Sequence, residues 1–359
     1  MREKLLLSGN EAVARGAYEA GVHFAAAYPG TPSTEILEAI AKNYADKIKC
    51  QWATNEKVAV EVGIGACYGG ARTLTAMKHV GVNVAADPLF TLSETGVNGG
   101  FILVSADDPG LHSSQNEQDN RRYANFAKMI LLEPSNSQEA KDFVKIGINL
   151  SEKFDLPVML RITTRISHSK SVVEIGEREE VPVKEYTPDI KKRVVIPSHA
   201  RVLHRKLEER LLEVKKYANE IEINKIIDGN YTKDGKKIGI ISSGISFNYA
   251  REVFPDAKFL KLGMPYPFPV ELARKFVDSV DEIWIIEENE PFIEEELRIA
   301  ELGDKITVGK DKIPLCGELN QAIIREAILG ETPRTPEVDV SQLPARPPVL
   351  CPGCPHRGI

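Results

Sequence analysis

Short apolar runs alternate with helical patterns through the first half of the chain. Helical patterns, with apolar residues three or four positions apart, cover Glu11–Ala20, the segment after Thr34, Lys57–Tyr68 and Gln138–Glu152. Apolar runs of strand length lie at Phe24–Tyr28, Arg72–Met77, Gly100–Ser105, Met129–Glu133 and Val158–Thr163. This alternation predicts an α/β fold with a doubly wound parallel sheet.

The rhythm changes in the middle of the chain and then returns. A charged, proline-punctuated stretch (EIGEREEVPVKEYTPDIKKR) precedes a predicted Glu/Lys-rich helix at His199–Glu220. A smaller α/β unit follows, with predicted strands at Lys237–Ser242, Lys258–Leu262 and Glu282–Glu287 and predicted helices near Ser246–Val253 and Pro269–Val280. We therefore expect one domain at 1–180, a helical connector at 181–236 and a second domain at 237–330.

The last segment, 331–359, is proline-rich (TPRTPEVDVSQLPARPP) and ends in CPGCPHRGI. Such composition is typical of a semi-rigid linker. A Cys-x-x-Cys motif directly after a linker indicates the opening of a third domain, so we expect the chain to be the front part of a longer protein.

Composition and charge narrow the class of protein. The chain has 359 residues, 42% hydrophobic and 27% charged, with a net charge of -6, which is ordinary for a globular protein and gives no electrostatic footprint for nucleic acid. No apolar run reaches the roughly 18 residues that a membrane span needs, so no membrane association is expected. The odd count of five cysteines, with Cys50, Cys67 and Cys316 widely scattered, argues against a disulfide framework and indicates a cytoplasmic protein.

The segment Tyr28-Pro29-Gly30-Thr31-Pro32-Ser33-Thr34 lies at the carboxyl end of a predicted strand. Ligands of doubly wound sheets bind beyond such strand ends, so this turn is a candidate binding site. The alternative is a plain turn in which Ser33 or Thr34 caps the next helix.

Glu56 is the candidate acid. It lies in the first turn of the predicted helix within ATNEKVAVEVGIGACYGGA, where the helix dipole stabilises an anion. The four glycines Gly63, Gly65, Gly69 and Gly70 permit close approach by a neighbour or ligand. Simple charge complementarity at the helix start is the alternative, and Glu61, rotated off the same face, is a lesser candidate.

A polar loop, SADDPGLHSSQNEQDNRR (105–122), follows another predicted strand. Its groups able to reach a pocket are Asp107, Asp108, His112, Gln115, Asn116 and Arg121. Loops after α/β strands often carry function, although a solvated loop has the same composition. Cys351 and Cys354 supply two ligands of a zinc or iron–sulfur site or a redox pair, and the remaining histidines show no metal-binding spacing.

Four segments together resemble a known family. They are SGNEAVARGAYEAGV…AAYPGTPSTEI, WATNEKVAVEVGIGACYGGARTLTAMKHVGVN, DDPGLHSSQNEQDNR and CPGCPHRG. The chain resembles the α subunits of the indolepyruvate branch of the thiamine-diphosphate 2-oxoacid:ferredoxin oxidoreductases. The resemblance implies a pyrimidine-binding domain at 1–180, a transketolase-C-like domain at 237–330, and the start of a diphosphate-binding domain near Leu350.

The resemblance also implies the chemistry. Such enzymes oxidatively decarboxylate arylpyruvates to aryl-acetyl-CoA and reduce ferredoxin, with thiamine diphosphate, Mg²⁺ and [4Fe-4S] clusters as cofactors and CoA as co-substrate. The diphosphate and Mg²⁺ motif and most cluster ligands are expected outside this chain, so the chain alone should be inactive. A smaller β subunit, ferredoxin and a second α subunit are the implied partners.

Several residues take roles from the family motifs. Glu56 matches the glutamate that bonds N1′ of the aminopyrimidine, and Tyr28, Pro29 and Gly30 are expected at the cofactor. Thr31 and His112 match residues near the substrate.

One position departs from the family pattern, and two cysteines match it in a way that leaves open whether they bind iron. Asp107 stands where pyruvate enzymes carry a carboxylate-binding arginine, so Arg121 is the expected replacement. Cys351 and Cys354 match two cluster ligands. The alternative functions are a non-oxidative thiamine-diphosphate decarboxylase and a non-catalytic scaffold subunit.

Overall fold

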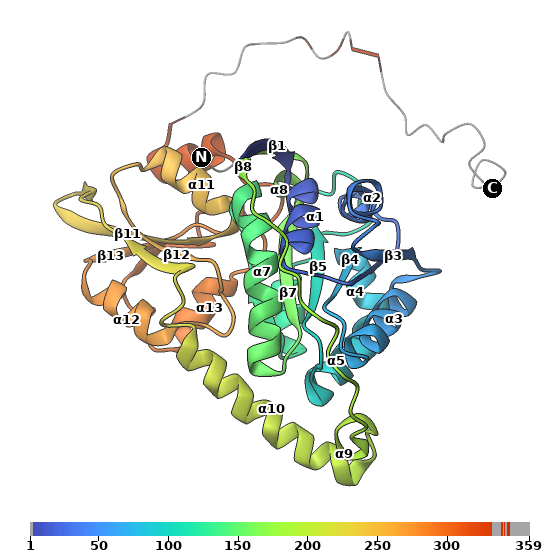
Figure 1. Cartoon of the computed structure of the whole chain (residues 1–359). Coiled ribbons are helices and arrows are strands. Elements are labelled where there is room, and N and C mark those ends of the chain that lie inside the picture. The colour runs from blue at the N-terminus through green and yellow to red at the C-terminus, as the bar shows by residue number, and fades with distance from the viewer. Residues whose placement is uncertain (1–2, 332–338, 340, 342, 345–359) are drawn as a thin grey trace.

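The computed structural model describes residues 3–331, 339, 341, 343 and 344. Two α/β units, here called the first and the second layer in the order of the chain, lie side by side. The long helix α10 (Pro197–Tyr217) runs below both in Figure 1. The prediction of a doubly wound parallel sheet followed by a smaller α/β unit is confirmed. The expected roles of 331–359, and with them Cys351 and Cys354, lie almost entirely outside the described residues.

The first sheet has six strands, all parallel, in the order β3-β2-β4-β5-β7-β6. They are β2 (Phe24–Ala27), β3 (Lys49–Trp52), β4 (Thr73–Lys78), β5 (Phe101–Asp107), β6 (Ile130–Leu132) and β7 (Val158–Thr163). All but the edge strand β3 are apolar and buried, as expected of parallel strands covered on both faces. A separate antiparallel pair joins β1 (Lys4–Ser8) to β8 (Lys170–Glu174).

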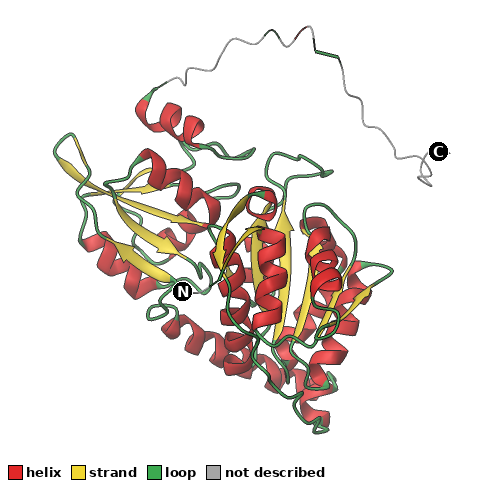
Figure 2. Ribbon diagram, turned by 45° about the horizontal axis from the view of Figure 1, so that its top comes forward, coloured by secondary structure: helices red, strands yellow, loops and turns green. Residues whose placement is uncertain are grey.

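Helices cover both faces of this sheet (Figure 2). One face carries α1 (Gly9–Glu19), α2 (Thr34–Asn43) and α7 (Ser137–Phe154), which pack on residues such as Ile102 and Leu160. The other carries α3 (Glu56–Tyr68), α4 (His79–Val84), α5 (Ala86–Thr95) and α6 (Arg121–Phe126). The short helices α8 (Thr164–His168) and α9 (Ile190–Arg193) lie in the connecting segments.

The second sheet has the order β14-β13-β11-β12-β9, with β10 paired to β11. Its strands are β9 (Asn224–Ile227), β10 (Thr232–Lys233), β11 (Lys236–Ser243), β12 (Lys258–Leu262), β13 (Glu282–Ile285) and β14 (Ile306–Val308). Its helices are α11 (Gly244–Val253), α12 (Val270–Asp278), α13 (Phe292–Ile299) and α14 (Gln321–Leu329). The strands β11–β14 are parallel, whereas β9 and β10 are antiparallel to their neighbours.

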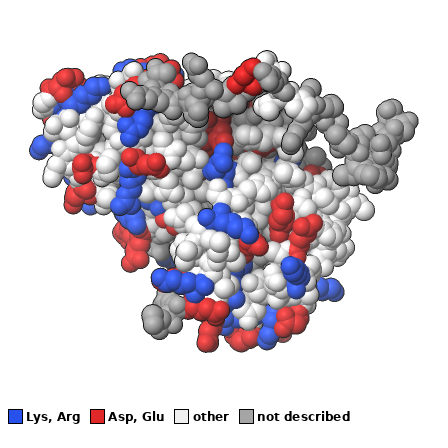
Figure 3. Space-filling view, turned by 90° about the horizontal axis from the view of Figure 1, so that it is seen from above, with Lys and Arg blue, Asp and Glu red and all other residues white. Residues whose placement is uncertain are grey.

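One continuous apolar core joins the two sheets, because residues of α3 to α6 pack in the same cluster as Ile241 of the second sheet and Phe276 of its helix α12. From the top of Figure 1, charged side chains of both signs are scattered over a largely uncharged face (Figure 3). No helix in the described part of the chain is long and apolar enough to cross a membrane.

Candidate functional site

The strands of the first sheet are added in two opposite directions, and the change of direction falls between β2 and β4. The connection from β2 leads outward to β3, and the next one crosses back to β4 on the other side of β2. Loops that leave such a switch point in opposite directions open a crevice at the carboxyl ends of the strands. Because the six strands are parallel, the turn after β2, Glu56 after β3 and the loop after β5 all lie along this edge.

Glu56 begins α3 and lies against a glycine of the neighbouring helix. Asn55 caps the helix by accepting a 2.9 Å hydrogen bond from the Val58 amide. A Cβ on Gly81, in α4, would lie 2.6 Å from Glu56 Cγ and 2.7 Å from its Oε1. The half-exposed carboxylate makes no hydrogen bond or ion pair with any residue that the structure describes. It is therefore free to bind a ligand, whereas Glu61 is exposed and lies 3.8 Å from Lys57 Nζ.

The turn after β2 is built by local hydrogen bonds. The Gly30 amide donates to Thr34 Oγ1 (2.8 Å) and the Ser33 hydroxyl donates to the Gly30 carbonyl (2.8 Å). Ser33 precedes α2 but its side chain makes no capping bond, so these hydroxyls shape the turn itself. Tyr28 is 38% exposed, and Thr31, which precedes the cis-Pro32 bond, is also exposed.

The end of β4 supplies two residues that sequence reasoning did not assign to the site. Lys78 ends the strand, and His79, fully buried, begins α4. The His79 Nε2 donates to the Asn116 Oδ1 (2.9 Å) and faces the Asn116 carbonyl oxygen (3.2 Å), whereas Nδ1 has no partner in the described chain. The sequence pattern could have indicated these two residues, because Lys78-His79 directly follow a predicted strand, as do the turn at Tyr28 and the loop at 105–122.

Asp108 holds the loop after β5 in place. Its carboxylate accepts hydrogen bonds from the Ser113 amide (2.8 Å), the Ser114 hydroxyl (2.6 Å) and the Thr164 hydroxyl (2.7 Å). Burial alone would raise the pKa of Asp108, but these hydrogen bonds outweigh it and hold the pKa below its usual value. His112 is half exposed, with Nε2 3.5 Å from Glu318 Oε2 of the second layer.

Asp107 and Arg121 are buried in structural bonds. Asp107 accepts from Arg161 Nε (2.6 Å) and from the Asn120 amide (2.9 Å), and burial raises its pKa. Arg121 is 1% exposed and binds Asp119 and Glu287, each at 2.6 Å.

The remaining donors of Arg121 reach the carbonyl oxygens of Glu288 (2.8 Å) and Glu290 (2.9 Å). The interpretation of Arg121 as the substrate-binding arginine is therefore wrong. Its donors are taken by the neighbouring Asp119 and by partners from the second layer that lie more than 160 residues away in the sequence.

The same ion cluster fastens the carboxyl edges of the two sheets to each other. Arg161 of β7 binds Glu133 after β6, and the Ser243 hydroxyl of β11 donates to that carboxylate (2.6 Å). Burial raises the pKa of Glu288 to about 7, although the Leu319 amide donates to it, and burial lowers the pKa of Lys310 to about 8. This interface therefore combines a buried ion cluster with apolar packing.

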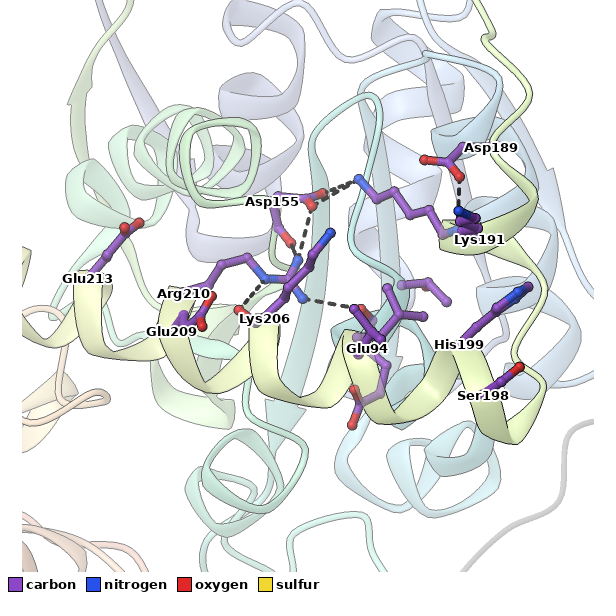
Figure 4. Close-up of a pocket in the computed structure, with 14 residues that line it drawn as sticks. Glu94, Asp155, Asp189, Lys191, Ser198, His199, Lys206, Glu209, Arg210 and Glu213 are labelled. Carbon is purple, nitrogen blue, oxygen red and sulfur yellow. Dashed lines mark hydrogen bonds and ion pairs between the residues drawn. The ribbon is translucent and has the colours of Figure 1, made fainter.

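A cavity of about 620 Å³ lies elsewhere, between α10 and the ends of α5 and α7 (Figure 4). Its Lys192 and Arg210 side chains both bind Asp155, at 2.8 and 3.1 Å. It contains none of the predicted site residues and lies toward the amino ends of the strands, so it is separate from the crevice. No cluster of three potential metal ligands occurs in the described residues.

Comparisons with known proteins define the class. Residues 15–220 match the family described as pyruvate flavodoxin/ferredoxin oxidoreductase, thiamine diphosphate-binding. The chain belongs to this family.

The particular relatives are indolepyruvate oxidoreductase subunits. The chain is 42% identical to "Indolepyruvate oxidoreductase subunit IorA" of Methanothermobacter thermautotrophicus over 99% of its own length and 60% of the relative. It is 43% identical to the protein of the same name from Thermococcus kodakarensis, over 99% of the chain and 58% of the relative. The chain thus spans about three fifths of the length of these curated relatives.

Solved structures confirm the fold class. The 2-oxoglutarate:ferredoxin oxidoreductase from Magnetococcus marinus superposes with a TM-score of 0.75 at 17% identity, over 92% of this chain and 65% of that chain. A split-gene transketolase superposes with a TM-score of 0.53 at 14% identity, over 84% of this chain and 88% of that one.

Proposed function

We propose that the chain is the front part of an α subunit of an oxidoreductase that decarboxylates indolepyruvate and other arylpyruvates to aryl-acetyl-CoA, with ferredoxin as electron acceptor. One observation carries the proposal: Glu56 presents an unpartnered carboxylate at the switch point of a sheet whose family binds thiamine diphosphate. The relatives named above supply the substrate class.

The residues at the crevice fit the pyrimidine half of this cofactor. When bound, thiamine diphosphate supplies the carbanion and the electron sink for 2-oxoacid cleavage. Glu56 would share a proton with ring nitrogen N1′, and the backbone of Tyr28, Pro29 and Gly30 would flank the ring. Gly81 leaves the space in which the carboxylate lies. Thr31 and His112 lie on the turn and loop that border the crevice and would face the substrate.

Exposed apolar residues on the two elements that flank Glu56 support a partner surface. Edge strand β3 and helix α3 expose Trp52 (41%) and Val62 (37%), and a Cβ on Gly65 would meet nothing within 4 Å. Apart from Glu56, Lys57 and Glu61, helix α3 is made of apolar residues and Tyr68, and a largely apolar helix is normally buried. We infer that a diphosphate-binding domain, from a second α subunit, covers this face and brings Mg²⁺.

The further partners would be a smaller β subunit and ferredoxin, with CoA as co-substrate and [4Fe-4S] clusters bound by Cys351, Cys354 and other residues. Cys50, Cys67 and Cys316 are all free, which supports a cytoplasmic location for the complex.

Two alternative functions make different predictions. A non-oxidative decarboxylase would release an aldehyde without reducing an acceptor, and a scaffold subunit would not need Glu56.

The test is an assay of the complete α and β subunits with CoA and a viologen dye. We expect dye reduction that depends on an arylpyruvate, with kcat/KM for indolepyruvate well above that for pyruvate or 2-oxoglutarate. Aldehyde formation without dye reduction would favour the non-oxidative enzyme instead.

A further inference from the structure

Lys78 lies at the carboxyl edge of the first sheet, between the turn after β2 and the loop after β5. It ends β4, the strand beside the switch point. A Cβ on Gly30 would lie 3.2 Å from Lys78 Cβ and 3.7 Å from its Cδ, so the aliphatic stem packs directly on the turn after β2. The ammonium donates a hydrogen bond to the Ser113 carbonyl oxygen in the loop after β5. The side chain is thus held by both segments that border the site.

The charge on Lys78 is not neutralised by the protein. The other cations in the segments that follow these strands each bind a carboxylate: Arg121 binds Asp119 and Arg161 binds Asp107, both at 2.6 Å, Arg122 binds Glu295 at 2.5 Å, and Arg165 binds Glu318 at 2.7 Å. Within the described residues, Lys78 Nζ has no carboxylate oxygen within 4.0 Å.

Asp108 is the acid whose charge acts on Lys78, but its oxygens already accept three hydrogen bonds. Burial lowers the pKa of Lys78, and the opposing effect of Asp108 is smaller. An ammonium carries three N–H donors, and the protein uses one. A half-buried cation with free donors is therefore prepared for an anion that the described part of the chain does not supply.

We propose that Lys78 binds the carboxylate of the 2-oxoacid substrate, together with Thr31, in the role that the sequence suggested for Arg121. The inference rests on the proposed function and extends it. A lysine is a compact point charge with rotatable donors, so it can hold a carboxylate from the sheet side while the aryl group of the substrate extends toward the open side. Its place on a strand, rather than on a loop, makes the anchor rigid.

The first experiment uses the full-length α subunit in complex with its β subunit. In Lys78→Met, which keeps the aliphatic stem, we expect KM for phenylpyruvate to rise about tenfold or more, the scale of a lost charge-assisted hydrogen bond. Affinity for thiamine diphosphate, titrated by intrinsic fluorescence, should not change. In Lys78→Arg, which keeps the positive charge, KM should stay close to the wild-type value. Lys42→Met, an exposed lysine on α2, should behave as wild type.

A binding measurement separates this inference from the proposed function. Calorimetry compares binding of indole-3-lactate, an unreactive 2-hydroxy acid, with binding of its neutral primary amide. The wild-type complex should bind the acid more tightly than the amide, and Lys78→Met should abolish this difference. An unchanged KM and an unchanged acid preference in Lys78→Met would overturn the role of Lys78. Absence of 2-oxoacid turnover by the wild-type complex would overturn only the proposed function. The role of Lys78 in carboxylate binding would still be decided by comparing how wild type and Lys78→Met bind the acid and its amide.

Discussion

At the scale of single residues, the candidate site depends on two charged side chains that have no oppositely charged partner among the described residues. Glu56 and Lys78 both lie at the switch point, and each packs on a glycine, Gly81 and Gly30 respectively. Sequence position was enough to select Glu56 and the turn at Tyr28, because both directly follow or begin predicted elements. The contact between Glu56 and Gly81 was not predictable, because it joins two segments that meet only in the folded sheet.

Gly81→Ala should disable Glu56 without damaging the fold. The added Cβ would overlap the Glu56 carboxylate at 2.6–2.7 Å, and a flexible side chain yields at lower cost than backbone. We expect 2-oxoacid-dependent dye reduction to fall at least about tenfold, a barrier change of about 1.4 kcal/mol, with little change in Tm.

The double variant Gly81→Ala/Glu56→Gln provides the control. If Gly81 acts only through Glu56, adding Gly81→Ala to Glu56→Gln should cause no further loss of thiamine diphosphate affinity, which can be measured even where turnover is abolished. Additive losses in the two variants would show that Gly81 serves another purpose.

At the scale of elements, periodicity predicted the long helices and buried strands well. The predicted helix at Lys57–Tyr68 corresponds to α3 (Glu56–Tyr68), and the predicted strand at Val158–Thr163 matches β7. Edge strand β3 has the sequence Lys-Cys-Gln-Trp and is largely exposed, so it gave no apolar run to detect. The β1–β8 pair was also missed, because its register joins segments more than 160 residues apart.

The exposed face of α3 and β3 gives a prediction for assembly. Val62→Asp adds a second negative charge next to Glu61 on the exposed side of α3, and we expect it to weaken α-subunit association and thiamine diphosphate binding together. Val172→Asp, on the exposed side of β8, is the matched control and should leave both unchanged. Analytical ultracentrifugation and a cofactor titration measure the two effects. Normal association in Val62→Asp would remove α3 from the proposed interface.

At the scale of the whole molecule, buried ion pairs hold the two layers together. Arg121 contacts Glu287 and the carbonyls of Glu288 and Glu290 across the interface. A single sequence shows that an arginine follows a loop, but not which distant acids surround it. For this reason the sequence pattern predicted a substrate ligand at Arg121, whereas in the structure Arg121 binds the two layers to each other.

Arg121→Ala and its neighbour Arg122→Ala test this distinction. Removing Arg121 leaves buried Asp119 and Glu287 without their main partner, and we expect a loss of about 3–5 kcal/mol in the free energy of unfolding. Arg122 is 40% exposed in a surface pair with Glu295, so its loss should cost less than about 1 kcal/mol. Denaturant titration of both variants checks the order, and equal losses would contradict it.

The most direct measurement of the central claim compares Glu56→Gln with Glu61→Gln in the complete complex. Both changes remove one negative charge from α3, but only Glu56 lies at the crevice. The account predicts that Glu56→Gln abolishes 2-oxoacid-dependent viologen reduction while Glu61→Gln keeps wild-type activity. Retention by Glu56→Gln of more than about a tenth of the wild-type rate, a difference of about 1.4 kcal/mol in barrier, would contradict it.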